Sequence, residues 1–517
     1  MFLCTPKYLA TGLMTILSLA ANPLMAEQVT LNSLDGTVSM SGDLLEFDGA
    51  TYQLKMLIGE ISIDASQVVC EGPGCPNLIA GLTEFSIAGS GAMGAGLLPT
   101  LIEVFALDRG GDLEVATNAD GSQNYSVLNA DGTVFASITI QATDTLSGLA
   151  GLLEGSAVIG MATRQMNQNE RAAFELSGKG RLVGSENEQI VALDAVIATV
   201  NPQNPVQILS LSQISGIFDG SISNWNQVGG NDAPITLYRQ SEEADTNQAF
   251  IAAAGALSFA TTASILETNQ AVSDAVAADA NGIGLTSYAQ QRNARAVVLR
   301  SVCGELFEPT EFSIKTEEYP LSERLYLYTA KGAVPDVAAE FLAFVASPEA
   351  QSVIRNSGYI DQDVSRASLD AQGRRLAQAI VSSSGRTELL QLQDLTSIML
   401  DADRLSFTLH YGPDGQLDAR AQADIVRLAA MIGDGAFSSR QMLLLGFSDN
   451  TSAINAQLSA TQNMAQNVRD AIVVATGRAN MGNLRISPIG YGQLLPLSCN
   501  ETTDGQRRNN RVEIWVK

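Results

Sequence analysis

Three loops rich in glycine and hydroxyl side chains are the parts of this 517-residue chain best suited to binding an anion. They span residues 89–93, 145–148 and 162–164, and each follows a short apolar stretch. Backbone N–H groups at a helix N-terminus, together with Ser and Thr hydroxyls, can surround an anion that no lysine touches. Plain strand-to-helix turns use the same residue types, so both interpretations stay open for each loop. The candidate ligand residues are Ser90, Gly91, Thr145, Ser147 and Thr163.

The single histidine, His410, limits the catalytic chemistry that this chain can do. A Ser-His-Asp or Cys-His catalytic unit, or a histidine-based metal site, would have to use it. His410 lies in an alternating run at residues 405–411, which is typical of a strand rather than of a catalytic loop. We therefore expect a binding protein that is not an enzyme and that has no cofactor and no metal.

The cysteines predict one local disulfide. Cys70 and Cys75 bracket the turn-forming sequence Glu-Gly-Pro-Gly, so their sulfurs can meet across a tight loop in an oxidising compartment. A zinc site is the weaker alternative, because about four ligands are needed and no histidine lies nearby. Cys303 and Cys499 either pair or stay as buried thiols, and both possibilities remain open.

Residues 1–26 have the features of a signal peptide, with one charge at Lys7, an apolar core and small residues before Glu27. An uncleaved anchor is the alternative. No later stretch reaches about 18 uninterrupted apolar residues. The net charge of -25 disfavours binding to nucleic acid. We expect an exported protein of the periplasm.

Four regions with different sequence patterns follow along the chain. Residues 27–80 alternate in short runs between Asp-Gly and Gly-Asp pairs and predict a small β-rich unit. Residues 81–360 alternate apolar strands, loops and helices, which predicts an α/β fold of two lobes with ligands at the carboxyl ends of parallel strands. Residues 361–397 read as a polar, partly helical linker. Residues 398–517 predict a compact module with the element order βαβαββ.

The first half of the chain contains a series of motifs in a fixed order. They lie at residues 193–197, 201–206, 214–220, 224–225, 228–230 and 235–239, and SPEAQ at 347–351 with GYI at 358–360 follows. Together they resemble the second lobe of the phosphate-binding proteins of ABC transporters. The resemblance implies a bilobal, type II periplasmic-binding-protein fold with phosphate or another small oxyanion as ligand. It also implies an ABC transporter permease as partner, and Arg239 and Thr246 as ligand residues in the second lobe.

One departure from this family bears on the ligand. The family follows its arginine with Ser-Gly-Thr, whereas this chain has Ala244, Asp245 and Thr246, preceded by Glu242 and Glu243. A desolvated carboxylate that faces phosphate costs free energy through like-charge repulsion. We therefore expect phosphate to bind more weakly here than in relatives that keep Ser-Gly-Thr.

The C-terminal region resembles OmpA-like, peptidoglycan-associated domains. The resemblance rests on GFSDNT at residues 446–451, on Asn455 with Leu-Ser at 458–459, on GYG at 490–492 and on the stretch at 500–513. It implies a pocket for a peptidoglycan stem peptide, with Asp449 facing the ammonium of diaminopimelate. Where the family has a helical arginine, this chain has Gln462 or Met464, depending on the alignment. The proposed peptidoglycan-binding residues are Asp449, Asn455, Arg507 and Arg511.

Two functions fit these observations. The first is a non-enzymatic periplasmic solute-binding protein that is tethered to the cell wall, or near the outer membrane, through its OmpA-like domain. The alternative is a structural protein of the cell envelope whose bilobal domain has lost its small ligand and mediates protein contacts.

Overall fold

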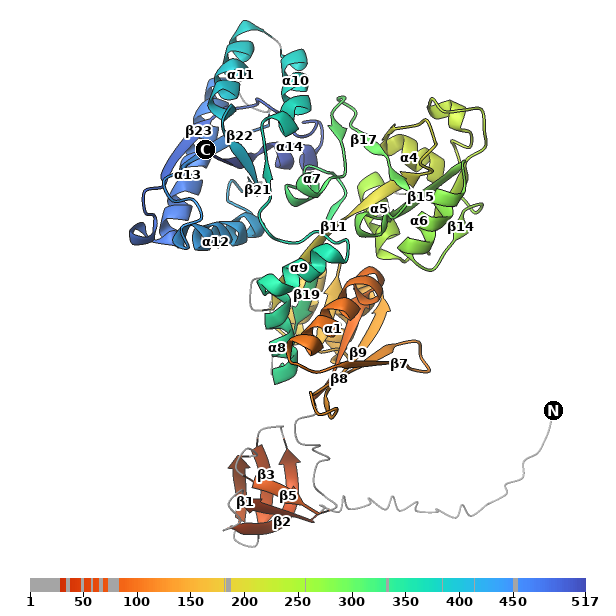
Figure 1. Ribbon diagram of the computed structural model, residues 1–517, viewed down its shortest axis with the longest axis vertical. Coiled ribbons are helices and arrows are strands. Elements are labelled where there is room, and N and C mark those ends of the chain that lie inside the picture. Colours follow the sequence, from red (N-terminus) through yellow and green to blue (C-terminus); the bar gives the residue numbers. More distant parts are fainter. Residues whose placement is uncertain are drawn as a thin grey trace, which may run out of the picture. The chain divides into compact units, whose positions relative to one another are not determined.

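The structure of the chain is a computed structural model (Figure 1). It describes residues 28–33, 38–47, 51–56, 59–64, 68–72, 83–180, 182, 187–255, 257–331, 334–383, 385–412, 414–449 and 454–517. The chain divides into two compact units, Met1–Leu82 and Thr83–Lys517. The predicted signal peptide, residues 1–26, lies outside the described residues.

The first unit is a small antiparallel sheet of five strands in the order β4-β3-β2-β1-β5. Its strands are β1 (Gln28–Ser33), β2 (Ser39–Phe47), β3 (Thr51–Met56), β4 (Gly59–Asp64) and β5 (Val68–Glu71). Alternate side chains of β1 and β3 form its core, namely Val29, Leu31, Tyr52 and Leu54. Cys70 on β5 is disulfide-bonded. Cys75 lies outside the described residues, so the pairing of these two cysteines stays a prediction.

Two long strands, β11 (Glu188–Val200) and β19 (Ser322–Thr329), join the two lobes of the second unit. The residues of β11 up to Ala195 pair with β19, whereas those from Val196 onward pair with β15 (Gly282–Ser287). One continuous sheet therefore connects two separate hydrophobic cores.

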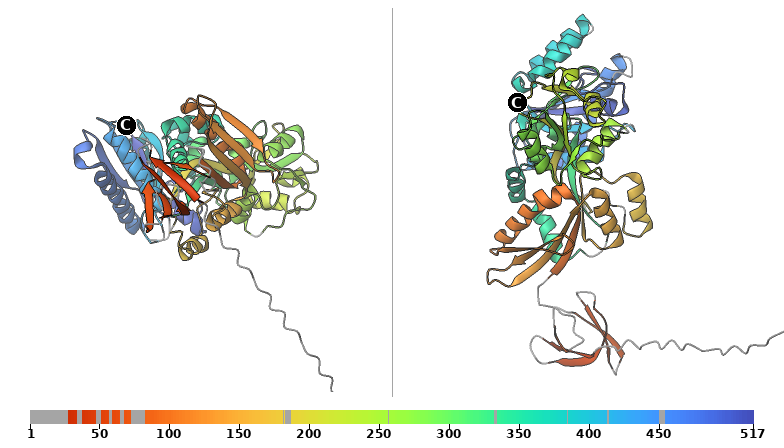
Figure 2. Two further views of the ribbon diagram at one scale, coloured as in Figure 1. Left: turned by 90° about the horizontal axis from the view of Figure 1, so that it is seen from below. Right: turned by 90° about the vertical axis from the view of Figure 1, so that its right-hand side faces the viewer.

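Lobe one is built around three parallel strands, in which β6 pairs with both β9 and β10. Its elements are β6 (Thr83–Ser90), η2 (Met93–Leu97), α1 (Leu98–Asp108), β7 (Leu113–Thr117), β8 (Gln123–Leu128), β9 (Val134–Thr143), α2 (Thr145–Glu154), β10 (Ile159–Ala162), α3 (Gln168–Leu176), α8 (Asp336–Val345) and α9 (Pro348–Asn356). Helices lie on both sides of this sheet (Figure 2). Buried side chains of α1, α8 and α9 pack on one face, and those of α2 and α3 pack on the other. The alternation of strands, loops and helices that the sequence predicts for residues 81–360 is present in this lobe.

Lobe two continues the same sheet with β15, β13 and β14. Its other elements are β12 (Ile208–Ser210), α4 (Leu211–Phe218), η3 (Trp225–Val228), β13 (Thr236–Arg239), α5 (Asp245–Ala254), β14 (Ser264–Ile265), α6 (Asn269–Ala278), η4 (Tyr288–Gln290), β16 (Arg295–Ala296), β17 (Val298–Arg300), β18 (Leu306–Phe307) and α7 (Glu311–Lys315). β13 pairs parallel with both β14 and β15. The loop after β13 therefore opens at the carboxyl edge of the sheet, as the loops of lobe one do.

The C-terminal module has the predicted βαβαββ elements. They are β21 (Asp403–His410), α12 (Ala419–Gly433), β22 (Gln441–Phe447), α13 (Ile454–Thr476), β23 (Arg485–Gly490) and β24 (Arg511–Val516), with α14 (Thr503–Asn509) before the last strand. The sheet order is β20-β21-β24-β22-β23, where β20 is Arg366–Ala367. The helices α12 and α13 pack on one face, with Ile425, Leu428 and Ile432 in the core. These three residues lie at helical spacing and form one apolar stripe along α12.

The segment at 361–397, expected to be a linker, is instead part of this module. It contains α10 (Gly373–Ser382) and most of α11 (Arg386–Met399). Leu376 and Leu392 pack against Leu445 and Trp515 on the second face of the sheet. A sheet with two apolar faces needs cover on both, and these helices provide it.

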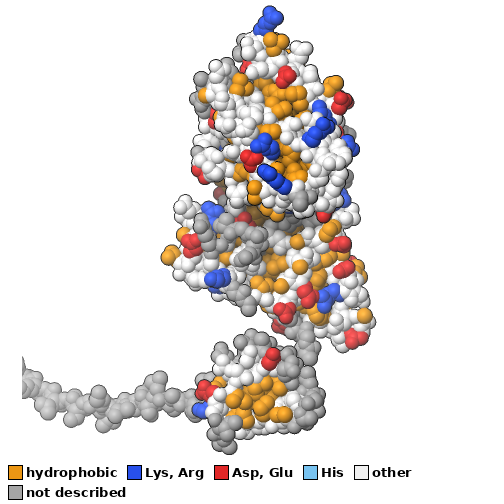
Figure 3. Space-filling model, turned by 90° about the vertical axis from the view of Figure 1, so that its left-hand side faces the viewer, with side chains coloured by type: hydrophobic (Ala, Val, Ile, Leu, Met, Phe, Trp, Pro, Cys, Tyr) orange, Lys and Arg blue, Asp and Glu red, His pale blue; other side chains and the backbone are white. Residues whose placement is uncertain are grey.

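Several large apolar side chains of α10 and α11 remain exposed, among them Ile380, Val381 and Leu390. Figure 3 shows hydrophobic side chains between Lys and Arg side chains over the upper part of the molecule. Within the described ranges, no single helix combines the length and apolar composition needed to cross a membrane, although the bent pair α8–α9 meets both criteria jointly.

Candidate functional site

The three candidate loops of lobe one meet at one edge of the sheet. β6 ends at Ser90, Thr145 begins α2 directly after β9, and Thr163 follows β10. Because β6 is parallel to both neighbours, the three carboxyl ends lie together. The three side chains are buried, and the Thr163 N–H donates to Thr145 Oγ1 at 3.1 Å. Gly91 lies close by, where an added Cβ would come within 2.9 Å of the Thr143 carbonyl oxygen.

Ser147 takes part in the N-terminal cap of α2, and its role as a ligand stays a prediction. Asp144 caps α2, and it accepts from the Ser147 N–H at 3.0 Å and from the Ser147 hydroxyl at 2.6 Å. Ser147 is exposed. Both of its donors are therefore used by the helix cap rather than by a ligand.

The structure does not bring the predicted lobe-two residues to the lobe-one donors. Arg239 is buried, donates to the Gln240 carbonyl oxygen at 2.9 Å, and stacks on Phe259 with 4.4 Å between its guanidinium carbon and the ring centre. Thr246 donates to Asn269 Oδ1 at 3.1 Å. Both side chains are thus held inside lobe two, and their role as ligands stays a prediction.

The residue that does reach lobe one is Asp245, the first residue of α5. Its Oδ1 accepts from the Thr145 N–H at 3.0 Å. Burial raises the pKa of Asp245, the N–H and hydroxyl of Thr145 and the hydroxyl of Ser90 act in the opposite direction, and Asp144 adds a further upward effect. The sequence predicts that this carboxylate repels an anion. In the structure, the carboxylate accepts a hydrogen bond from Thr145, one of the residues predicted to bind the anion.

A groove of about 1800 Å³ passes this site. It is lined by lobe one at Thr163, by lobe two at Asp245 and by the C-terminal module at Arg427. Glu323 on β19 also lines it, and burial, followed by the charges of Asp194 and Asp245, raises the pKa of Glu323 well above its usual range. Glu323 is therefore a second carboxyl group in this groove, and its burial favours the protonated form.

His410 lies on β21, as predicted, and its side chain is buried in the C-terminal module. Burial lowers its pKa to about 3, with the positive charges of Arg420, Arg507 and Arg511 acting in the same direction and Glu317 opposing them. The imidazole is neutral at physiological pH.

In the C-terminal module, Asp449 lies at the end of β22 beside Asn510. The Asn510 amide donates to Asp449 Oδ2 at 3.0 Å, and the Asp449 N–H donates to Asn510 Oδ1 at 3.1 Å. Asp449 is half-buried, and Asn455 is exposed at the start of α13. Asn510 is a contact of Asp449 that the motifs do not identify, although it lies within the stretch at 500–513.

Arg511 is engaged inside the C-terminal module, and its expected role in a ligand pocket stays a prediction. Its side chain is fully buried and donates to Glu513 at 2.7 Å and to the Leu495 carbonyl oxygen at 2.7 Å. Arg507 lines the groove at the boundary with lobe two, where its charge lowers the pKa of Glu317. Neither arginine is placed beside Asp449 by a contact that the described residues show.

Gln462 and Met464, which align with the family's helical arginine, both make contacts that stabilise the module. The amide of Gln462 donates to the Pro488 carbonyl oxygen at 3.1 Å and accepts from the Gly490 N–H at 2.9 Å, which fixes β23. Met464 packs against the core of the module. An arginine at either position would disturb these contacts.

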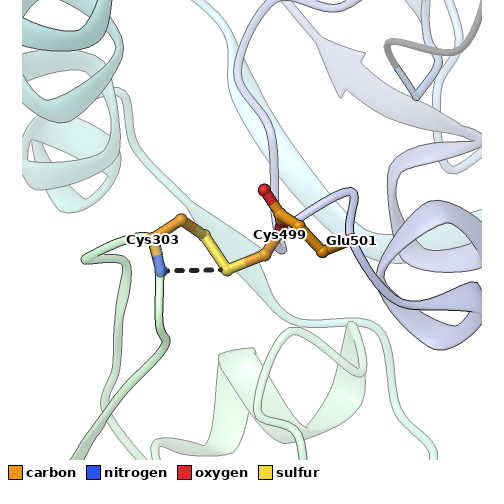
Figure 4. A group of neighbouring side chains, drawn as sticks. All are labelled: Cys303, Cys499 and Glu501. Carbon is orange, nitrogen blue, oxygen red and sulfur yellow. Dashed lines mark hydrogen bonds between the residues drawn. A yellow bond between two sulfur atoms is a disulfide. The ribbon is translucent and has the colours of Figure 1, made fainter.

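Cys303 and Cys499, left open by the sequence, form a disulfide between the turn after β17 in lobe two and the segment before α14 (Figure 4). Their Cα atoms are 5.8 Å apart, and the Cys303 N–H donates to the Cys499 sulfur at 3.2 Å. Glu501 lies beside them. Because both sulfurs are used in the disulfide, neither can serve as a thiolate ligand for a metal.

Two lobes joined by two crossing strands, with anion-type loops at the edge between them, define a bilobal solute-binding fold. The chain belongs to the PBP superfamily, whose domain model matches residues 81–349.

The similar proteins are named as phosphate-binding proteins. The chain is 29% identical over 243 residues to the phosphate-binding protein PstS of Bacillus subtilis, covering 46% of this chain and 76% of the relative. It is 28% identical over 242 residues to PstS of Pseudomonas aeruginosa, covering 43% and 73%. The prediction that the chain is not an enzyme is confirmed, because these relatives are binding proteins.

Two solved structures cover different parts of the chain. A putative phosphate ABC transporter substrate-binding protein from Clostridium perfringens is 24% identical, with a TM-score of 0.41, covering 54% of this chain and 99% of its own. The peptidoglycan-associated lipoprotein of Burkholderia pseudomallei is 18% identical, with a TM-score of 0.19, covering 21% of this chain and 89% of its own.

Proposed function

We propose that the chain is an extracytoplasmic solute-binding protein whose cleft is built for a small oxyanion of the phosphate type. The observation that carries the proposal is the meeting of Ser90, Thr145 and Thr163 at the N-terminus of α2, where N–H and hydroxyl donors converge without a lysine. The names of the relatives support phosphate as the ligand class and an ABC transporter permease as the partner. The signal-like sequence at 1–26 supports a periplasmic location.

Titration of the full chain with inorganic phosphate, followed by calorimetry, tests this function. We expect measurable but weak binding, which Thr163→Val weakens further by about fivefold because one buried hydroxyl donor is lost. Thr133→Val is the matched control, since Thr133 lies in the turn at the far end of β9. The proposal fails if Thr163→Val and Thr133→Val leave the same affinity as the unchanged chain.

We further propose that the C-terminal module is an OmpA-like domain that binds a peptidoglycan stem peptide and tethers the chain to the cell wall. The motif at 446–451 and the βαβαββ order support this. Asp449 of that motif follows β22 and accepts from the Asn510 amide, which directly precedes β24. A half-buried carboxylate suits the ammonium group of diaminopimelate.

Removing the Asp449 carboxylate is expected to weaken sedimentation of the full chain with peptidoglycan by roughly thirtyfold, equivalent to about 2–4 kcal/mol, because the ligand ammonium is left unpaired. A binding series with increasing peptidoglycan measures the shift for Asp449→Ala. Asp470→Ala is the control, since it removes an exposed carboxylate of α13 that pairs with Arg469. Equal sedimentation of all three proteins would show that the module is a scaffold rather than an anchor.

One observation favours the second candidate, a structural envelope protein without a small ligand. The Asp245 carboxylate lies on the Thr145 N–H, where an external anion would bind. If neither the unchanged chain nor a variant without the Asp245 carboxylate binds an oxyanion, the structural role is favoured over solute binding.

A further inference from the structure

The contact between Asp245 and Thr145 joins the two lobes across 100 positions of sequence. Thr145 begins α2 in lobe one, and Asp245 begins α5 in lobe two. The Asp245 carboxylate accepts the Thr145 N–H at 3.0 Å. Each residue lies at the carboxyl edge of its own lobe's sheet, which is the edge where this fold class binds its ligand.

The donors that Asp245 uses are those of an anion site. α2 has ten residues, and its first N–H groups have no partner within the helix and carry the positive end of the helix dipole. Asp144 already satisfies the N–H of Ser147 as the helix cap. The Thr145 N–H is therefore available to a second anionic group. The Asp245 carboxylate is that group.

The charges around Asp245 make hydrogen bonding the main attraction. Asp144 and Glu323 are both acidic, and each interacts unfavourably with Asp245. Arg164 lies near enough for Asp245 to influence its pKa, but its guanidinium is paired with Glu170 at 2.7 and 2.9 Å. The N–H and hydroxyl of Thr145, with the hydroxyl of Ser90, are the groups that favour the ionised Asp245 carboxylate.

We propose that Asp245 is a built-in ligand of the cleft, whose carboxylate takes the place of an external oxyanion on lobe one and holds the lobes together in the empty protein. This inference rests on the proposed oxyanion function of the cleft. An external anion binds only by displacing a group that the chain itself delivers at high effective concentration. The population of the binding-competent state, and with it the apparent affinity, is lowered accordingly.

Small-angle scattering and phosphate calorimetry on the full chain test this inference with two variants. Asp245→Gly removes the carboxylate, and Asp245→Asn removes its charge while keeping its size. In phosphate-free buffer, we expect Asp245→Gly to show a larger radius of gyration than the unchanged chain. Asp245→Asn, whose amide oxygen can still accept the Thr145 N–H, should show a smaller increase. Phosphate affinity should rise by at least about tenfold in Asp245→Gly, and added phosphate should return this variant to the compact form.

Glu243→Gln is the matched control, because it removes an exposed carboxylate two residues earlier in the same loop. The inference is overturned if Asp245→Gly has the compactness and phosphate affinity of the unchanged chain, or if Glu243→Gln produces the same changes. Expansion of Asp245→Gly with no phosphate binding in any protein would support the built-in ligand and refute the oxyanion function, so the two claims fail separately.

Discussion

Replacing Glu513 by alanine is expected to lower the free energy of unfolding of the C-terminal module by about 3–5 kcal/mol, because three arginines lose a buried carboxylate that they share. Glu513 is fully buried on β24. Its carboxylate lies 2.7 Å from Arg511 Nη2 and 3.3 Å from Arg404 Nε, and it also pairs with Arg375. Burial alone would raise its pKa, but the three arginines hold the pKa well below its usual range.

Urea unfolding followed by tryptophan fluorescence measures this loss, since Trp515 lies two residues away and donates to Glu513 at 3.2 Å. Glu513→Gln keeps the size and removes the charge, and we expect it to behave like the alanine variant. Asp470→Ala serves as an exposed control. A loss in Glu513→Ala no greater than in this control would contradict the role assigned to the network.

The second large effect is expected at Glu317, where lobe two meets the C-terminal module. Its carboxylate lies 2.8 Å from Arg420 Nη1 and pairs with Arg324, and its carbonyl oxygen accepts from Arg508 at 2.9 Å. Burial would raise the pKa of Glu317, but the charges of Arg324 and Arg420 outweigh it and hold the pKa well below its usual range. We expect Glu317→Gln to lower the free energy of unfolding by about 2–4 kcal/mol at pH 7.

The effect of Glu317→Gln should depend on pH in a defined direction. Because the pKa of Glu317 is lower in the folded than in the unfolded chain, its stabilising contribution is complete above the unfolded value of about 4.3. That contribution is lost as the pH falls through 4.3 toward the folded pKa. Urea unfolding at pH 7 and at pH 4 should therefore show a smaller difference between variant and unchanged chain at pH 4. Glu349→Gln, at an exposed position on α9, should show no such change.

The elements of the chain were largely predictable from local patterns, and one error shows where such patterns stop. The stripe of Ile425, Leu428 and Ile432 predicts α12, because helical spacing of apolar residues needs no knowledge of the partner. The polar composition of residues 361–397 predicts a linker, yet Leu376 and Leu392 within this segment cover the sheet. Whether these apolar residues are buried depends on the second apolar face of the sheet. The local sequence of the segment carries no information about that face.

The candidate site likewise has one feature that a general rule predicts and others that no local pattern predicts. The meeting of Ser90, Thr145 and Thr163 follows from a general rule, since the carboxyl ends of neighbouring parallel strands lie at one edge. The contact of Asp245 with Thr145 follows from no local rule, because it depends on how two lobes close on each other. The disulfide between Cys303 and Cys499 spans 196 residues, and the spacing of the cysteines does not predict it either.

Amide hydrogen exchange at Thr145 tests most directly whether Asp245 fills the anion site of lobe one. In phosphate-free buffer, the Thr145 N–H should be protected in the unchanged chain, because it donates to Asp245 at 3.0 Å. It should exchange faster in Asp245→Gly, and inorganic phosphate should restore its protection in that variant alone. Equal exchange at Thr145 in the unchanged chain and in Asp245→Gly, without phosphate, would contradict the assignment of Asp245 as the ligand of its own cleft.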